Sequence, residues 1–465
     1  MKSAKQNIIL AAALAAMATT TAGAQNTYSG YFLNDYTYRY QMNPAFGNES
    51  NFVSMPALGN LNIGMQGNLH LKDVLYNIEG KTCLFTNPGV DAAEVMSHIH
   101  DKNRIGANVK VNILNGGWKA WGGYNTVSIS AVANAEVKVP GSLFSLLKEG
   151  VSNSEYEINN LGATANAYAE IALNHSRDIK EVPGLRVGAA VKFLIGVGSI
   201  DARFKDARLT LGQNSWDITA QADLYANVKG LKFKHDYNDD VTPAREYVSG
   251  AEIDGFGLNG FGLGFDLGAT YEWNGGEFQN WKFSAALLDL GFISWGQTHL
   301  ASTNGLVDFK TNDYTFQLKS KDNEGQDELD NMLNKLSELY QLQDMGETGG
   351  RTRALAATLN LAAEYEFPYY KPLHFGLVNS TRINGSYTWT QFRLSANVKP
   401  VDIFSASANV AVSTFGWSFG WLLNLNLHKG FNFFLGMDHT LGKLAKQGVP
   451  LSSNASVNLG IDFPF

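Results

Sequence analysis

The sequence has little cysteine, proline or charge, and these shortages narrow the class of protein. Its 465 residues include 11 prolines and a single cysteine, Cys83, which cannot form an internal disulfide. A small domain held together by disulfides is therefore excluded. Only 17% of the residues are charged, and the net charge is −7 without any basic cluster. This pattern excludes a nucleic-acid partner, because nucleic-acid-binding surfaces concentrate lysine and arginine.

Long apolar runs are also missing. No run after residue 24 approaches the roughly 18 apolar residues of a transmembrane helix. The shorter run Ile8–Met17 follows Lys2 and Lys5. It is followed by the small residues of Ala22-Gly23-Ala24. This order is typical of a secretory signal peptide, so we expect residues 1–24 to be removed from the mature protein.

No motif predicts a cofactor, a metal or a catalytic site. Gly255–Gly260 matches the glycine spacing of a dinucleotide-binding loop, but alternating aromatic residues follow it. Such a loop needs a helix N-terminus facing the pyrophosphate. No cluster of histidine and cysteine has metal-ligand spacing, and no Ser/His/Asp grouping stands out. We therefore expect no cofactor and no enzymatic activity.

What the sequence does contain is a two-residue hydrophobic period, with 47 glycines and 12% aromatic residues. In the closing stretch, apolar residues alternate with small or polar ones, which predicts a strand with one apolar and one polar face. The same period recurs along the chain, with a shift near Leu287-Leu288 that predicts a β-bulge. Fourteen segments show it: 61–71, 105–113, 127–137, 161–173, 185–197, 261–273, 281–295, 355–367, 373–377, 392–399, 404–412, 417–427, 431–437 and 455–465.

These segments predict an all-β transmembrane antiparallel β-barrel of about 14 strands in the bacterial outer membrane. Most are about 9 to 15 residues long, as a tilted strand needs to cross a bilayer. Lipid offers no hydrogen-bond partners, so the strands must close into a ring. Short turns alternate with long connections, which we expect to be extracellular loops. The segment 202–227 also alternates and is expected to extend above the membrane.

The polar faces of the strands predict a charged lumen. Lys192, Glu364, Glu366 and Arg393 are expected to face inward, and their mixed signs favour a salt-bridged, largely filled interior. One loop, 324–343, has apolar residues at three- and four-residue spacing and predicts an external helix. That helix is either a lid or docking element at the barrel mouth, or a helix packed on the barrel's own loops.

Three stretches carry a family resemblance: Tyr38–Phe46 with its Asn43-Pro44-Ala45, the segment 191–196, and the terminal Phe465. With them the chain resembles a Bacteroidetes outer-membrane β-barrel family of unassigned function. It is more distantly similar to the long-chain fatty-acid transporter (FadL-like) barrels of 14 strands.

The resemblance implies a domain plan and several roles. Residues 25–58 would form an N-terminal plug, or hatch, and 59–465 the barrel. Asn43, Pro44, Ala45 and Phe46 would lie in or under the lumen as part of that hatch. The last strand resembles the closing strand of outer-membrane barrels, where the terminal residues are the signal read by the barrel-assembly machinery. Phe463 and Phe465 would be that signal here.

Two functions remain open from the sequence. The first is passive uptake of hydrophobic small molecules, which the resemblance favours slightly. The second is a scaffold that binds protein partners at the cell surface, which the long loops and charged lumen suggest. A barrel-embedded hydrolase is the least favoured reading. The expected surroundings are outer-membrane lipid and lipopolysaccharide, and the expected ligand or partner is a hydrophobic molecule or a second protein.

Overall fold

The computed structural model describes residues 27–78, 81–149, 155–158, 161–211, 216–238, 245–255, 257–273, 275–303, 307–311, 342–427, 430–440, 452 and 454–465. The expected signal peptide 1–24 lies outside these residues. So does the expected helix 324–343, apart from its last two residues, Leu342 and Gln343, of which Gln343 begins strand β17. Among the described residues, no helix is long and apolar enough to span a membrane.

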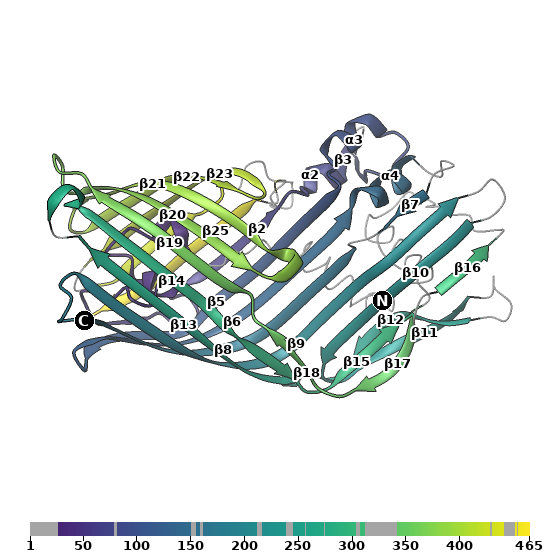
Figure 1. Cartoon of the computed structure of the whole chain (residues 1–465), viewed down its shortest axis with the longest axis horizontal. Helices are drawn as coiled ribbons and strands as arrows, with labels where there is room; N and C mark the ends of the chain where they lie inside the picture. Colours follow the sequence, from purple (N-terminus) through teal and green to yellow (C-terminus); the bar gives the residue numbers. More distant parts are fainter. Residues whose placement is uncertain are drawn as a thin grey trace.

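The chain forms a closed antiparallel β-barrel of 14 strands (Figure 1). Each strand pairs with the next around the ring, and the last pairs with the first through Leu61 and Leu459. The number and order of strands predicted from the two-residue period are confirmed. The strands are β2 (Leu61–Gly67), β5 (Lys102–Ala120), β6 (Gly123–Pro140), β8 (Gly162–Asp178), β9 (Leu185–Leu211), β13 (Gly260–Glu272), β14 (Trp281–Trp295), β19 (Ala357–Glu366), β20 (Leu373–Ile383), β21 (Trp389–Val401), β22 (Phe404–Ser413), β23 (Gly416–Asn426), β24 (Asn432–Met437) and β25 (Ala455–Pro464).

The barrel is polar inside and apolar outside, the reverse of a water-soluble protein. Strand β21 shows this clearly. Arg393 is 1% exposed and Asn397 is 1% exposed, whereas the outward Phe392 and Leu394 are 54% and 61% exposed. Because hydrocarbon is the only surrounding in which such an apolar band is stable, the barrel spans a membrane.

One strand extends beyond the sequence-based expectation, and another carries the bulge that was expected. β20 was expected to end at Leu377 but continues to Ile383. The two-residue rule failed there because the outward Asn379 and Thr381 are polar; both bond to Thr390 of the neighbouring strand instead. In β14 the expected bulge is present, and it places Asp289 in the left-handed region with φ 58°.

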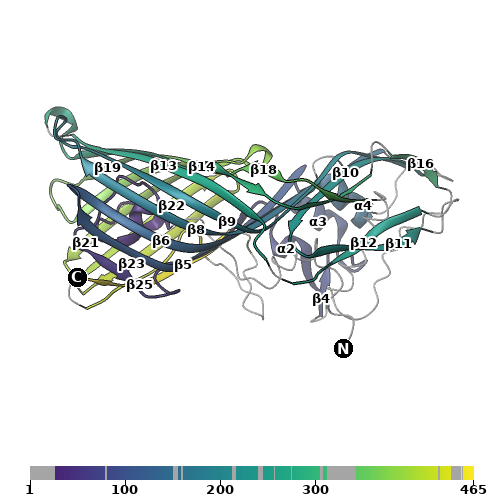
Figure 2. The same ribbon diagram turned by 90° about the horizontal axis from the view of Figure 1, so that it is seen from below.

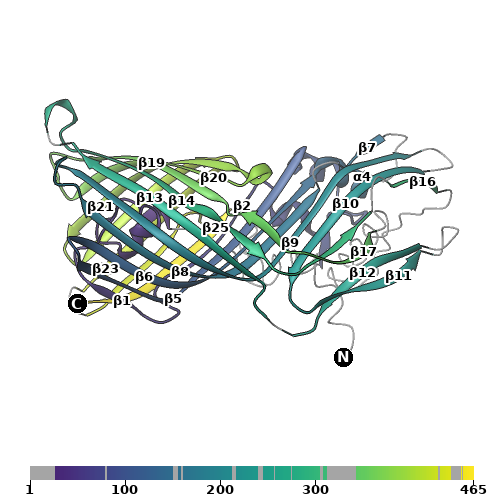
Figure 3. The same ribbon diagram turned by 60° about the horizontal axis from the view of Figure 1, so that its bottom comes forward.

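The long connections build an extension beyond one end of the barrel, which we call the long-loop end (Figures 2 and 3). The alternating segment 202–227 forms the end of β9 and most of β10 (Trp216–Val228), and these two strands pair with each other. β10 also pairs with β15 (Thr298–Ser302) and β16 (Val307–Thr311), and β15 pairs with β17 (Gln343–Thr348). The hairpin of β11 (Leu231–Asn238) and β12 (Arg245–Ile253) forms a separate two-stranded sheet beside it.

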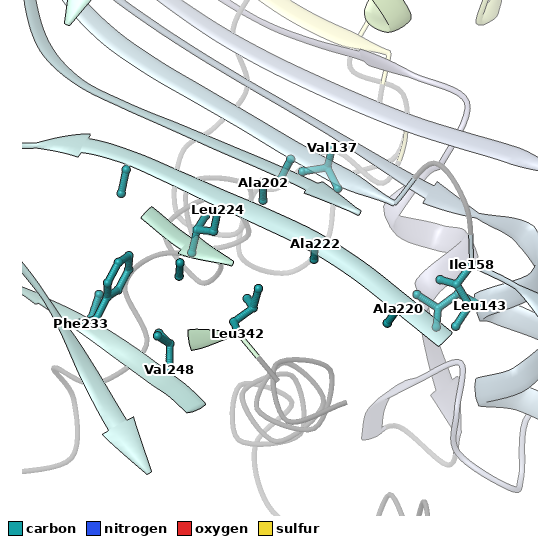
Figure 4. Close-up of a cluster of buried hydrophobic side chains, with 14 of the residues drawn as sticks. Val137, Leu143, Ile158, Ala202, Ala220, Ala222, Leu224, Phe233, Val248 and Leu342 are labelled. Atoms are coloured by element: carbon teal, nitrogen blue, oxygen red, sulfur yellow. The ribbon is translucent and has the colours of Figure 1, made fainter. Parts of the chain in front are cut away.

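The extension has an apolar core of its own (Figure 4). Leu224 of β10, Phe233 of β11 and Val248 of β12 meet Leu342 there, and Ile158 closes one side. Most of the remaining short elements flank this core or the barrel mouth. They are α2 (Leu71–Val74), β3 (Leu75–Ile78), β4 (Lys81–Leu84), α3 (Ala92–His98), α4 (Gly141–Glu149), β7 (Glu155–Glu157) and the 3-10 turn η4 (Gly385–Tyr387). The 3-10 turn η3 (Gly276–Phe278) lies at the other end of the barrel, in the short connection between β13 and β14.

The opposite, short-turn end carries the C-terminus (Figure 1). Two short strands complete the wall. β1 (Phe52–Ser54) fits between β25 and β5 below β2. β18 (Arg351–Ala354) continues β19 beyond a two-residue gap and pairs with the end of β14.

Candidate functional site: the occluded lumen

The N-terminal segment (residues 27–50) lies inside the barrel, where Figure 1 draws it in purple. A 14-stranded ring is wider than its own side chains can fill, so the lumen has room for a chain segment. The segment forms the 3-10 turns η1 (Tyr28–Gly30) and η2 (Thr37–Gln41). Its aromatic side chains make one buried cluster with inward residues of the wall, Tyr124, Val378, Leu422 and Phe434.

Asn43 and Pro44 rest on two glycines of the wall. Gly188 in β9 and Gly268 in β13 are direct partners in the strand pairing. A methyl group on Gly188 would lie 2.1 Å from the Pro44 carbonyl oxygen, and one on Gly268 would lie 2.1 Å from the Asn43 Oδ1. Only glycine allows the segment to approach the wall this closely.

Asn43 also binds the wall directly. Its Nδ2 donates to the carbonyl oxygens of Ala269 at 3.2 Å and Ala285 at 3.3 Å, so it joins β13 and β14. Its Oδ1 accepts from the Ala45 backbone N–H at 3.0 Å, which closes a turn around Pro44. Asn43 and Ala45 are both fully buried, and Phe46 is 7% exposed.

Two charged groups hold the segment at its ends. The Asp438 carboxylate accepts hydrogen bonds from the backbone N–H groups of Tyr28 at 2.8 Å and Ser29 at 2.7 Å. At the other end, the Nε of Arg186 donates to the Ala45 carbonyl at 2.7 Å. The segment is thus fixed to the wall by β9, β13, β14 and the residue after β24.

A cluster of charged side chains joins neighbouring strands on the inner face of the barrel. The Lys192 ammonium, in β9, lies 2.8 Å from Asp266 and 2.6 Å from Asp289, and 4.0 Å from Glu170. Lys110 in β5 pairs with Glu170 at 2.9 Å. The bulge in β14 turns Asp289 toward Lys192, which explains why the bulge lies at this level of the barrel.

Above the N-terminal segment, two cavities fill the space toward the long-loop end. One contains about 1060 Å³ of empty space, including its opening, and the other about 740 Å³. Gln41 and Tyr28 of the N-terminal segment contribute to their linings. Asn108, Asn134, Glu136 and Arg382 line both cavities.

One wall of the larger cavity is apolar, although it faces the lumen. Leu194, Ile293 and Trp295 form a buried cluster, exposed by no more than 3%, with Tyr168 and Leu355 packed against it. All of these except Leu194 line the cavity. The cavity therefore joins an apolar wall to a polar one.

The other residues singled out from the sequence lie in several places. Glu364 is 6% exposed and pairs with His374 at 3.2 Å, whereas Glu366 is half-buried near the short-turn end. Arg393 lies away from Lys192 and donates to Asn409 and to the Asp438 carbonyl. The aromatic side chains of Phe463 and Phe465 are exposed, at 42% and 74%. None of them lines the larger cavity except Lys192.

Two inward charges were missed by the sequence reasoning. Asp289 sits at the bulge, where the two-residue period is interrupted. Arg382 falls in the last part of β20, beyond its expected end. Extending the alternation from Gly376 would have placed Arg382 inward. Within the described residues, no three His, Cys, Asp or Glu side chains group closely enough to hold a metal ion.

The strand pairing, the apolar outer band and the filled lumen define a transmembrane β-barrel with an occluded interior. The chain belongs to the family of unknown function DUF5723, whose model matches residues 44–438. No curated protein matches it.

Several solved barrels have a similar arrangement. The toluene transporter TodX of Pseudomonas putida has a TM-score of 0.41 at 10% identity, covering 91% of this chain and 92% of that chain. The Ralstonia pickettii toluene transporter TbuX has a TM-score of 0.39 at 10% identity, covering 92% and 94%. A Pseudomonas aeruginosa FadL homologue has a TM-score of 0.39 at 10% identity, covering 96% and 100%. At such scores the fold rests on this chain's own strand pairing.

Proposed function

We propose that the protein takes up small hydrophobic molecules passively across a bacterial outer membrane. The observation that carries this proposal is the apolar wall inside the lumen. Inward positions of such a barrel are ordinarily polar, because they face water. An apolar surface there has no purpose in a water-filled pore, but it suits an apolar ligand.

In small-molecule sites, apolar and aromatic side chains bury the apolar part of the ligand and a few polar groups orient it. Most residues that line the larger cavity are polar, and its apolar wall is the part that can bury such a ligand. Ile293, Trp295 and Leu355 supply the apolar surface, and amides such as Asn134 stand across the cavity. Each fully buried apolar side chain of this size contributes roughly 1.5–3 kcal/mol. A few such contacts are enough for micromolar binding.

In this proposal the N-terminal segment acts as a hatch. It fills the lumen below the cavity, so a bound molecule can pass only when the segment moves. Asn43, Pro44, Ala45 and Phe46 are the hatch residues, and the glycine pair Gly188 and Gly268 is their seat. Uptake follows the concentration gradient of the ligand, and no catalytic step or cofactor is involved.

The proposed location requires export and assembly. Residues 1–24 would direct export and be cleaved, and Phe463 and Phe465 would be read by the barrel-assembly machinery. The short-turn end would then face the periplasm and the long-loop end the cell exterior, among lipopolysaccharide. The hatch would close the periplasmic half.

The test is naphthalene binding to the purified full chain in detergent, followed by the fluorescence of the tryptophans, which include Trp295 in the wall. Leu355→Asn places a polar side chain in the apolar wall. We expect it to weaken binding by about tenfold, from the loss of about 1.5 kcal/mol of apolar contact. Leu258→Asn, a 60% exposed position outside the cavity, is the matched control. Absence of naphthalene binding to the wild type, or equal binding by Leu355→Asn, contradicts the proposal.

A scaffold that binds protein partners is the second candidate. The observation that favours it is the extension beyond the long-loop end, whose apolar core is larger than a simple loop needs. Mild extraction followed by cross-linking distinguishes the two. A stable stoichiometric partner together with no ligand binding would favour the scaffold.

A further inference from the structure

We propose that Arg382 forms a binding site for an anionic group, and that ligands of this barrel carry a carboxylate, phosphate or sulfate. This inference deepens the proposed uptake function and rests on it. It begins from a buried positive charge in the cavity wall that makes no hydrogen bond and no close ion pair with the described residues.

Arg382 belongs to the last part of β20 and is only 9% exposed. Its Nε is buried and has no hydrogen-bond partner. No carboxylate oxygen of a described residue lies within 4.0 Å of a guanidinium nitrogen of Arg382, which is the limit for an ion pair. A buried charge without a partner is costly in an interior, so a protein normally pairs it or exposes it.

The other inward cations named above, Lys110, Lys192 and Arg393, all have partners. Lys192 and Lys110 bind carboxylates, at 2.6 Å and 2.9 Å respectively. Arg393 donates to Asn409 and to the Asp438 carbonyl. Arg382 therefore differs from its neighbours in having donors left for a molecule that is not part of this chain.

Its position suits a ligand. Arg382 lines both cavities above the hatch, together with Asn108 and Asn134, whose amides can donate further hydrogen bonds. Glu136 lines both cavities as well, and one of its oxygens accepts from Asn384. Glu136 attracts Arg382 electrostatically, but its carboxylate does not lie within the 4.0 Å of the guanidinium nitrogens that defines an ion pair.

Further cations surround the mouth of the same cavities. Arg104 donates to the Thr388 carbonyl at 3.1 Å, and the Lys138 ammonium lies 4.1 Å above the Tyr387 ring. Both contact the turn that follows β20, so they stand close to the end of the strand that holds Arg382.

The carboxylate at this mouth does not neutralise these charges. Asp201 is bound by Arg203 at 2.7 Å, by Arg351 at 2.8 Å and by Arg353 at 3.6 Å. Three guanidinium groups share this carboxylate, so the mouth keeps a local excess of positive charge although the whole chain is acidic. Glu136, Glu170 and Asp289 also line the larger cavity. It is the local excess at the mouth that attracts ligands of the opposite sign.

The chemistry of the group fixes the ligand class. A guanidinium is a planar fork of donors that matches two oxygens of a carboxylate, phosphate or sulfate. The cavity is compact and closed below by the hatch. We therefore assign the site to small organic acids or phosphate esters that enter from the long-loop end.

The test is equilibrium dialysis of the full chain in detergent against three probes. Benzoate carries a ring and a carboxylate, benzyl alcohol carries the ring without charge, and inorganic phosphate carries charge without a ring. Wild type, Arg382→Gln and Arg382→Lys are compared, with Arg177→Gln as the matched control, because Arg177 is exposed at the short-turn end of β8. Heat-modifiable gel mobility, which compares the migration of unheated and heated samples, checks that each variant is a folded barrel.

We expect the wild type to prefer benzoate over benzyl alcohol. Arg382→Gln should weaken benzoate binding about 10- to 100-fold, as expected for a lost charge-assisted hydrogen bond, and leave benzyl alcohol unchanged. Arg382→Lys should restore part of the loss, and Arg177→Gln should match the wild type. Phosphate binding that depends on Arg382 also supports the site and identifies its ligand as an inorganic or esterified phosphate.

Equal benzoate binding by Arg382→Gln and wild type overturns the inference. So does a wild-type preference for benzyl alcohol. In both cases naphthalene binding can persist, so these results would contradict the anion site without contradicting the uptake proposal. If the wild type binds neither naphthalene nor benzoate, both the uptake proposal and the anion site are contradicted.

Discussion

Replacing Asn43 by alanine should release the N-terminal segment from the barrel wall. The change removes two donated bonds, to the carbonyls of Ala269 and Ala285, and the accepted bond from the Ala45 N–H. Each buried hydrogen bond contributes about 0.5–1.5 kcal/mol net, so the docked state loses about 3 kcal/mol. At 1.4 kcal/mol per factor of ten, the undocked population rises about 100-fold.

The assay measures access to the buried segment. Cys83 is replaced by serine, and Ala45, which is fully buried, is replaced by cysteine as the reporter. The rate at which a water-soluble maleimide labels this cysteine follows the undocked population when redocking is fast. We expect Asn43→Ala to raise the labelling rate about 100-fold, in line with the lost hydrogen bonds.

Two further variants sharpen the result. Asn43→Asp keeps the acceptor of the Ala45 N–H but turns a carboxylate oxygen toward the carbonyls of Ala269 and Ala285, so its rate should equal or exceed that of Asn43→Ala. Glu49→Ala changes an exposed residue of the same segment and should leave the rate unchanged. A rate for Asn43→Ala within a few-fold of the wild type would refute the view that this side chain holds the segment.

Three other changes have defined outcomes. Gly188→Ala places a methyl group 2.1 Å from the Pro44 carbonyl, so the same reporter should label at least as fast as with Asn43→Ala; Gly116→Ala, where the nearest atom is 3.4 Å away, should have no effect. Lys192→Met leaves the buried Asp266 and the half-buried Asp289 without their cation. It should lower the free energy of unfolding by about 3 kcal/mol in urea titrations, unless both aspartates are also replaced by asparagine. Removing Phe465 should reduce the folded barrel in outer membranes but not refolding of the purified chain in detergent; equal amounts in both would argue against an assembly signal.

The strand order was readable from the sequence because one physical constraint acts on every strand. Lipid on one side and a polar lumen on the other impose a two-residue period, as in Gln391, Phe392, Arg393 and Leu394. Where that constraint relaxes, prediction fails. The outward Asn379 is polar, and its amide donates a hydrogen bond to the Thr390 hydroxyl. Because it breaks the alternation of apolar and polar residues, the expected strand ended too early.

The site was less readable, because its contacts join residues far apart in the chain. Nothing local to Gly188 or Gly268 indicates that Pro44 rests on them; that follows only from the pairing of β9 with β13. Arg382 was hidden by the early end of β20. Asp289 was hidden because a bulge changes which face a residue takes.

The most direct test of the account is uptake with the hatch fixed in place. Cys83 is first replaced by serine, and Asp35→Cys and Ser405→Cys are then introduced. In the native chain the Ser405 hydroxyl donates to the Asp35 carboxylate at 2.7 Å, which joins the N-terminal segment to β22. A short thiol-reactive bridge joins them and is cleaved by reductant. Naphthalene uptake into outer-membrane vesicles is then measured with the bridge closed and reopened. We predict that closing the bridge stops uptake and that reductant restores it. Equal uptake in both states would contradict the claim that the segment gates passage through the barrel.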